Sequence, residues 1–213
     1  MLISHSKRFI FTKTLKTGGT SVEIAFQPFC QSPDEPILHY TKPLIGRFGI
    51  VGARGKNSRR FEWFNHMPAS LIRQKLGNQM WHAYFKFSIV RNPFDKLVSY
   101  FHFSHPTLRS STDAEIVRRF NEWVNEGAHM PIDRDKYLID DLPALDRILR
   151  YEDLDREISD VAQHLECDIG PLQHYKSGYR NRKIGYRAYF GWNARQAVES
   201  RFAYELEQFH YDF

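Results

Sequence analysis

The sequence is poor in cysteine and has no long apolar run. Two cysteines, Cys30 and Cys167, occur among 213 residues. That is too few for a disulfide scaffold or a zinc site, so reduced core thiols are expected. No stretch reaches the roughly 18 apolar residues of a membrane-spanning helix. The first residues lack the apolar region and cleavage site of a secretory signal, which predicts a cytoplasmic location.

The chain has little net charge outside two short segments, which hold its excess of positive charge. The chain has 30 basic and 25 acidic residues, and its 26% charged and 15% aromatic residues are typical of a folded chain, here a single domain over residues 1–213. Nine basic residues lie in segments 54–60 and 176–187, which contain no acidic residue. Two separate patches favour a local anionic ligand and do not indicate nucleic acid, which usually meets a broader basic surface.

Patterns typical of strands and helices alternate along the chain. We expect strands at 8–12, 84–90 and 147–151, helices at 20–26, 69–76, 94–103, 154–166, from 113 to Gly127 and from Asn193 onward, and irregular structure over 28–65. Strands that alternate with helices pair in parallel. The pattern therefore predicts an α/β fold, a three-layer sandwich with a central parallel sheet and functional loops at the carboxyl ends of its strands.

A glycine-containing loop, residues 13–21 (KTLKTGGTS), joins the first strand to the first helix. Its glycines let backbone N–H groups converge, the helix start adds a positive dipole end, and Lys16 supplies a cation. The loop thus suits a phosphate or a sulfate, although a plain glycine-rich turn with a Thr or Ser cap has similar residues. It is not a Walker A loop, because the lysine precedes the glycines.

A second anion site is indicated where the strand at 84–90 ends. Arg91 stands at its carboxyl end, and Ser99 lies on the next helix, outside the apolar stripe of that helix. An arginine fork and a hydroxyl can hold a phosphate together. Taken singly, each residue is better explained without a ligand, the arginine as a cap for carbonyl groups and the serine as a solvent-facing residue.

Together these segments resemble those of the sulfotransferase superfamily that uses 3′-phosphoadenosine-5′-phosphosulfate (PAPS). Residues 16–21 (KTGGTS) are similar to the family's 5′-phosphosulfate loop, and residues 89–99 (IVRNPFDKLVS) to its 3′-phosphate motif. Leu15 stands where proline is usual. The likeness extends to residues 150–154 and 209–213 and is nearest to the branch with bacterial enzymes and Golgi heparan and chondroitin sulfate sulfotransferases.

The resemblance implies a P-loop-NTPase-like sulfotransferase fold. It also implies transfer of the sulfuryl group from PAPS to an acceptor hydroxyl, which leaves PAP and needs no metal. Lys16 would stabilise charge on the leaving group. The donor-binding residues implied are Lys16, Thr17, Gly18, Gly19, Thr20, Ser21, Arg91 and Ser99, with Ser177, Tyr179 and Arg180 in a closing loop that could equally be a solvated basic loop.

In-line transfer to an alcohol calls for a base, and histidine titrates near neutral pH. His66 is our candidate, because it precedes a helix about where related enzymes place a catalytic histidine. The alternative is a histidine that binds backbone at a helix start. His102 and His105 are weaker candidates, and Glu23 is weaker still as a base or an acceptor-orienting residue.

The sequence does not specify the acceptor. The resemblance favours a carbohydrate, and segment 54–60, just before His66, favours an anionic acceptor such as an acidic glycan, although a flexible basic insertion fits equally. Two other functions stay open, an ATP-dependent kinase of related fold and a non-catalytic polyanion-binding module. The absent Gly-Lys-Ser/Thr argues against the kinase, and the binding module would show a steep salt dependence.

Overall fold

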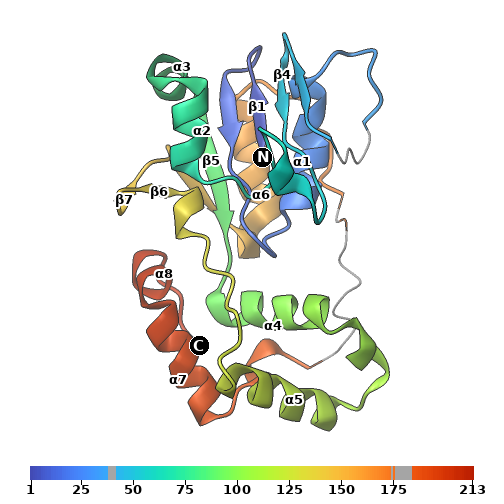
Figure 1. The fold of residues 1–213 in the computed structure, drawn as a ribbon, viewed down its shortest axis with the longest axis vertical. Coiled ribbons are helices and arrows are strands. Elements are labelled where there is room, and N and C mark those ends of the chain that lie inside the picture. The colour runs from blue at the N-terminus through green and yellow to red at the C-terminus, as the bar shows by residue number, and fades with distance from the viewer. Residues whose placement is uncertain (38–41, 174, 176–183) are drawn as a thin grey trace. The chain divides into compact units, whose positions relative to one another are not determined.

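The computed structural model describes residues 1–37, 42–173, 175 and 184–213 (Figure 1). The chain forms two compact units, the first from Met1–Val90 and Asp133–Tyr175, the second from Arg91–Ile132 and Lys176–Phe213. The strands are β1 (Leu2–Ser4), β2 (Phe9–Phe11), β3 (Leu44–Gly46), β4 (Gly49–Val51), β5 (Phe85–Val90), β6 (Leu138–Ile139), β7 (Leu142–Pro143) and β8 (Arg147–Arg150). The α-helices are α1 (Gly19–Phe26), α2 (Ala69–Leu76), α3 (Asn78–Ala83), α4 (Pro93–Ser104), α5 (Asp113–Asn125), α6 (Leu154–His164), α7 (Trp192–Arg201) and α8 (Ala203–Gln208).

The first unit is built on a six-stranded sheet in the order β3-β4-β1-β2-β5-β8. Its strands β2, β5 and β8 pair in parallel, with Phe9 opposite Phe85 and Phe87 opposite Arg147. The pairs β1–β2, β1–β4 and β3–β4 are antiparallel. It follows that β2, β4, β5 and β8 run in one direction. The expected α/β class is confirmed, and the three predicted strands correspond to β2, β5 and β8.

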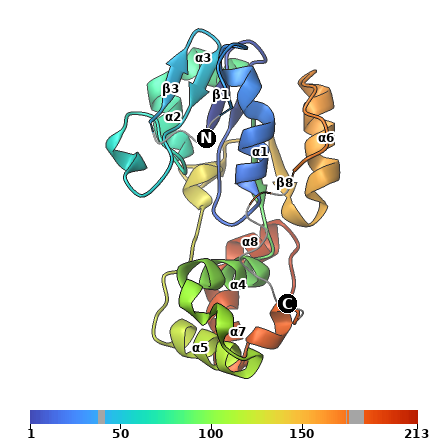
Figure 2. The ribbon, with the colours of Figure 1, turned by 90° about the vertical axis from the view of Figure 1, so that its right-hand side faces the viewer.

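Alternate side chains of these strands supply two apolar cores, because successive residues of a strand point to opposite faces. Phe9, Phe11 and Phe87 pack with α1 and α6, whereas Ile3 and Ile10 pack with α2 and α3. Figure 2 shows α1 and α6 on one side of the sheet and α2 on the other. The sheet is therefore covered on both faces, as the predicted three layers require.

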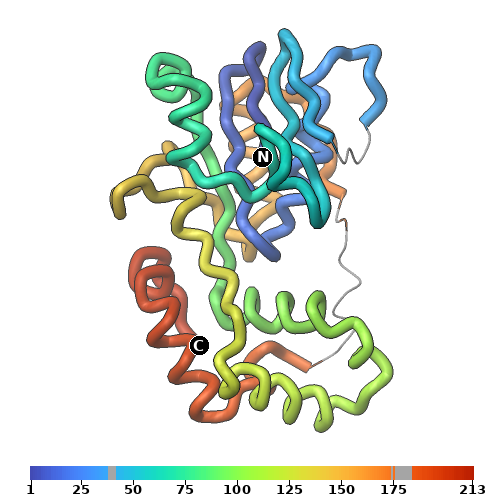
Figure 3. Tube along the Cα trace, in the orientation of Figure 1, coloured from blue at the N-terminus to red at the C-terminus, as the bar shows by residue number. Residues whose placement is uncertain are grey.

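The second unit is a helical cluster, traced in Figure 3 through α4, α5, α7 and α8. The expected apolar stripe of α4 is fully buried and packs against residues of the other helices, among them Phe120 and Phe202. Thr112 caps α5, since its hydroxyl accepts a hydrogen bond from the N–H of Glu115 at 3.2 Å, as its sequence predicts.

Several elements differ from the sequence-based expectations. Residues 44–51, expected to be irregular, form the β3–β4 hairpin, and β1 and α3 were not foreseen. The expectation that Asn193 caps a last helix is wrong. The helix begins at Trp192, Gly191 is its N-cap, and it breaks at Phe202 into α7 and α8. A distant contact decides this start, because the Gly191 N–H donates to Asn121 Oδ1 at 2.7 Å.

Cys30 and Cys167 are buried free thiols, as expected. Among the residues that the structure describes, no helix combines the length and apolar character needed to cross a membrane.

Candidate functional site

The loop between β2 and α1 turns sharply at two residues with left-handed backbone. Lys16 has φ 59° and Gly18 has φ 74°. Glycine suits position 18, because L side chains rarely adopt its left-handed backbone, and an added Cβ would also lie 2.8 Å from Leu154 Cδ2. The Thr14 hydroxyl donates to the Ile89 carbonyl of β5 and lies 2.8 Å from Thr17 Oγ1. These contacts fix the loop against the sheet.

The same loop presents a row of backbone N–H groups. Within the described part of the chain, the amides of residues 17–20 donate no hydrogen bond, and α1 begins among them. Two hydroxyls of the loop are engaged. Thr20 Oγ1 accepts from Lys13 Nζ at 3.2 Å, and Ser21 Oγ accepts from the Tyr175 N–H at 2.9 Å. Consecutive unbonded amides at a helix start form an anion-binding site.

A carboxylate that sequence reasoning missed braces this loop. Asp133 is 1% exposed, and its Oδ2 accepts a hydrogen bond from the Leu15 N–H at 2.8 Å. The two residues are 118 positions apart in the sequence. No local pattern could therefore have identified Asp133, because only the fold brings it to the loop.

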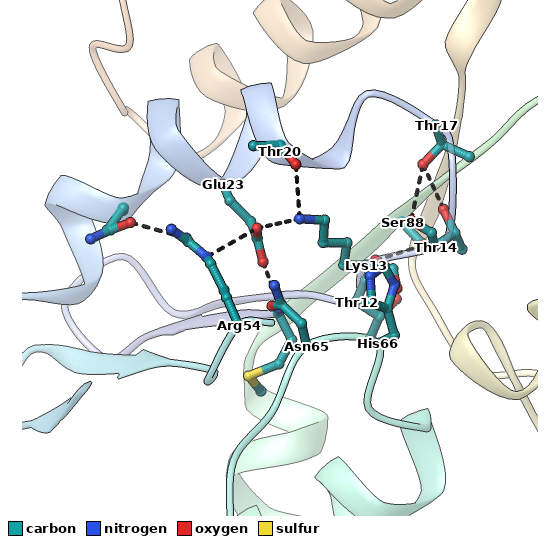
Figure 4. Close-up of polar contacts among 12 residues, drawn as sticks. Thr12, Lys13, Thr14, Thr17, Thr20, Glu23, Arg54, Asn65, His66 and Ser88 are labelled. Carbon is teal, nitrogen blue, oxygen red and sulfur yellow. Dashed lines mark hydrogen bonds and ion pairs between the residues drawn. The ribbon is translucent and has the colours of Figure 1, made fainter. Parts of the chain in front are cut away.

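His66 lies beside the carboxyl end of β2 (Figure 4). Its Nδ1 is 3.0 Å from the Lys13 carbonyl oxygen, and its backbone has φ 57°. A carbonyl only accepts hydrogen bonds, so in neutral imidazole Nδ1 carries the proton and Nε2 keeps its lone pair. The candidate base is thus held with its basic nitrogen turned away from that contact.

The environment of His66 disfavours its charged form. Burial lowers the pKa of His66 to about 3, and the positive charges of Lys13 and of the Met1 ammonium add to the effect. Glu23 and the Lys13 carbonyl oppose the shift but are outweighed. The ring is therefore neutral near pH 7, so Nε2 can accept a proton, and a pKa this low makes His66 a weaker base than an ordinary histidine.

Glu23, the weakest sequence candidate for a base, does not have the properties of one. Its side chain is fully buried, and its oxygens contact the Met1 ammonium at 2.8 Å and Lys13 Nζ at 2.5 Å. Burial raises the pKa of Glu23, but Lys13, the Met1 ammonium and Arg54 together lower it well below its usual range. A carboxylate so stabilised as an anion is a poor proton acceptor.

Arg91 and Ser99 belong to the second unit and lie at the start and middle of α4. The Arg91 guanidinium donates to Asp95 Oδ2 from Nε at 2.9 Å and from a terminal nitrogen at 2.5 Å. Asn92 caps the helix by accepting from the Phe94 N–H. Ser99 is half-buried and follows Asp95 by one turn. Arg91, which precedes the first helical residue, thus contacts Asp95, and Asp95 and Ser99 share one face of α4.

The other histidine candidates have structural contacts in the second unit. His102 is 3% exposed, and its Nε2 lies 2.8 Å from the Tyr189 hydroxyl. His105 Nδ1 lies 3.0 Å from the Phe101 carbonyl oxygen, and its ring packs on Phe101. His102 is thus a buried, hydrogen-bonded residue of the second unit, and His105 is half-buried against α4. Ser177, Tyr179 and Arg180 lie outside the described residues.

Among the residues described, no group of three or more His, Cys, Asp or Glu side chains could hold a metal ion. The parallel strands and the anion loop at the carboxyl end of β2 define an α/β protein of the class that binds phosphorylated nucleotides. The profile of the sulfotransferase family matches residues 1–212. The chain belongs to the sulfotransferase family, which confirms the expected class, that of PAPS-dependent sulfotransferases.

Two solved structures are similar to the chain. One is mouse sulfotransferase SULT7A1 complexed with PAP, at 15% identity and a TM-score of 0.51, over 96% of this chain and 86% of that one. The other is a sulfotransferase from Alicyclobacillus acidocaldarius, at 14% identity and a TM-score of 0.41, over 97% of this chain and 96% of that one. No curated protein sequence matches the chain. At this identity, the mouse structure supports the fold.

The lowered pKa of His66 predicts a loss of stability in mild acid. Below pH 6.5 the unfolded chain binds the proton and the folded one does not, so the stability linked to His66 is present above pH 6.5 and falls toward pH 3. Between pH 7.5 and 5.0, wild type should lose about 2 kcal/mol more free energy of unfolding than His66→Asn, measured by urea denaturation. Asparagine tolerates the left-handed backbone. Equal losses in the two proteins would contradict the burial of a neutral His66.

Proposed function

We propose that the protein transfers the sulfuryl group of PAPS to a hydroxyl of a carbohydrate acceptor, with His66 as the base. The observation that carries the proposal is the row of unbonded amides at residues 17–20, on the motif by which the chain resembles its family. We further propose that both units act as a single catalytic domain, because the family profile spans them. The buried free thiols Cys30 and Cys167 favour a reducing, cytoplasmic location.

The donor would be bound by two groups of residues. The amides of residues 17–20 suit the 5′ end of the nucleotide, because consecutive unbonded N–H groups at a helix start bind phosphate. PAP is present in the mouse sulfotransferase SULT7A1 structure. We assign the 5′ end to Lys16, Thr17, Gly18, Gly19, Thr20 and Ser21, the 3′-phosphate to Arg91 and Ser99, and the closing loop to Ser177, Tyr179 and Arg180.

The reaction would need little from the protein beyond charge and one proton acceptor. PAPS supplies the sulfuryl group, so the bond from the acceptor oxygen to sulfur forms as the bond from sulfur to the 5′-phosphate oxygen breaks. His66 Nε2 takes the proton of the acceptor hydroxyl. Lys16 and the loop amides stabilise the negative charge on the departing oxygen. The products are a sulfate ester and PAP.

PAP should stabilise the protein against heat. At a concentration of 100 times its Kd, a ligand that binds only the folded state adds about 2.7 kcal/mol. We expect a thermal shift with PAP, a smaller one with ADP, and none with PAP for Lys16→Ala. Lys75→Ala, which changes an exposed lysine of α2, is the control and should keep the shift. A shift with ATP and Mg²⁺ but not with PAP would favour the kinase, and a shift with neither would favour the polyanion-binding module.

His66→Asn should separate binding from chemistry. The variant keeps a side-chain amide that can donate to the Lys13 carbonyl but has no basic nitrogen, so PAP binding should be unchanged. Turnover of labelled PAPS should fall at least 100-fold, the usual contribution of a general base. Turnover within tenfold of wild type would place the base elsewhere.

The acceptor would be anionic, such as an acidic glycan. Segment 54–60 leaves the sheet after β4 and returns just before His66, with its ends joined by hydrogen bonds from the Ala53 N–H to the Trp63 carbonyl and from the Asn65 N–H to the Ala53 carbonyl. Its exposed cations, Lys56, Arg59 and Arg60, thus lie on a loop anchored next to the candidate base. Such a loop can attract a negatively charged chain to the hydroxyl that reacts.

Removal of the exposed cations of this loop should therefore weaken binding of the acceptor and leave binding of the donor unchanged. For Lys56→Ser/Arg59→Ser/Arg60→Ser we expect a KM for a carboxylated oligosaccharide raised about tenfold, or 1.4 kcal/mol, with kcat and PAP binding unchanged. The control, Arg118→Ser/Arg119→Ser, removes two exposed arginines of α5 that pair with Glu115 and Glu122. An unchanged KM in the triple variant would reject an anionic acceptor bound by this loop.

A further inference from the structure

A buried ionic cluster connects the phosphate loop to the segment that carries His66. At its centre is Glu23 in α1, whose side chain is 0% exposed. Glu23 Oε1 accepts from the Met1 ammonium at 2.8 Å, and Oε2 from Lys13 Nζ at 2.5 Å. Arg54 Nε lies 3.4 Å from the same Oε2. Figure 4 shows these groups converging on the carboxylate from separate segments of the first unit.

The cluster is confined, so its geometry has little freedom. The side chains of Lys13 and Arg54 are 9% and 11% exposed, and Arg54 also donates to Gln27 Oε1 at 3.0 Å. A charge in such surroundings persists only if it is paired and hydrogen-bonded, because burial costs several kcal/mol for an isolated ion. Removal of Glu23 would leave its cations without their common anion. The position of Lys13 therefore depends on Glu23.

Lys13 contacts both the start of α1 and the candidate base His66. Its side chain runs beside Gly19, where an added Cβ would lie 2.9 Å from Lys13 Cγ, and its Nζ donates to Thr20 Oγ1. Its backbone carbonyl meets His66 Nδ1 at 3.0 Å. One residue thus connects the start of α1, the carboxylate and the imidazole.

The residue before His66 is held by the same cluster. Asn65 is 8% exposed, and its Oδ1 accepts from the Met1 ammonium at 2.5 Å. His66 itself has a left-handed backbone, which a non-glycine residue adopts only when its surroundings impose it. Both residues of the Asn65–His66 pair are therefore fixed by groups that contact Glu23.

We infer that Glu23 is a positioning residue for the sulfuryl-transfer reaction. Through Lys13 it holds the carbonyl that keeps the proton of His66 on Nδ1, and so leaves Nε2 free to accept the proton of the acceptor. This inference rests on the proposed function of His66. Arg54, the first cation of the basic segment 54–60, is then a structural ion partner of Glu23. The acceptor would be bound by the exposed cations of that loop.

The test combines kinetics with the state of the His66 ring. In Glu23→Gln we expect kcat to fall about 100-fold, since a misplaced catalytic group costs that much, while the Kd for PAP stays within threefold. Two-dimensional ¹⁵N NMR of the ring nitrogens should show the Nδ1–H form in wild type and a mixture of Nδ1–H and Nε2–H forms in the variant. Wild-type kcat together with a pure Nδ1–H signal in Glu23→Gln would overturn the inference.

Two further variants keep the test decisive. Glu23→Gln/Lys13→Met removes one charge of each sign, so it should fold even where Glu23→Gln alone does not, and it should show the same loss of kcat and the same ring mixture. Retention of wild-type values in this double variant would also overturn the inference. Glu157→Gln is the matched control, because Glu157 pairs with Arg147 at 2.9 Å in the same unit and is 14% exposed. It should change stability but neither kcat nor the ring signals.

The two proposals fail in different ways. If wild type shows no transfer from PAPS, or if His66→Asn keeps its turnover, the proposed function fails, and the ring spectra of the Glu23 variants still decide whether Glu23 sets the His66 proton. If wild type transfers sulfate but its His66 carries the proton on Nε2, sulfuryl transfer stands, whereas Nε2 as the proton acceptor and the positioning role of Glu23 are both rejected.

Discussion

A single ionised carboxylate, buried in the first unit, fixes the relative positions of five chain segments. Glu23 contacts the Met1 ammonium just before β1, Lys13 just after β2 and Arg54 in the loop after β4. The same cations reach Asn65, Thr20 and Gln27. The Glu23 carboxylate is 0% exposed, so its charge cannot be solvated as an alternative to these partners. The arrangement around His66 therefore follows from electrostatic pairing more than from the shape of the backbone alone.

The pairing divides the basic residues of the chain into two kinds. Lys13 and Arg54 neutralise a buried charge and are nearly inaccessible, whereas Lys56, Arg59 and Arg60 are exposed on the loop that follows. Net charge gives no indication of this difference, because it counts a buried ion partner and a solvated cation equally. The loop that we propose binds the donor offers backbone amides, which carry no formal charge and concentrate partial positive charge at the start of α1.

The elements that could be predicted from the sequence are those determined by residues within or next to them. The glycines at 18 and 19, the proline at the start of α4 and the Thr112 capping residue act within a few positions of themselves, and the elements they define occur as expected. Strands β1, β3 and β4 have three residues each, too few for a period of two to stand out. The pairing of β1 with β4, as of Leu2 with Val51, also joins residues distant in the sequence. The start of α7 at Gly191 is set in the same way by Asn121.

The sequence by itself determined the family and the α/β class, since those depend on short motifs and on the alternation of strand and helix patterns. It also indicated His66 as a candidate base. Only the tertiary structure decided that Glu23 is an ion partner and not a base, that Asp133 braces the loop, and that Lys13 binds the His66 ring through its carbonyl. Those outcomes depend on burial and on contacts between residues up to 118 positions apart, which no local pattern in the sequence encodes.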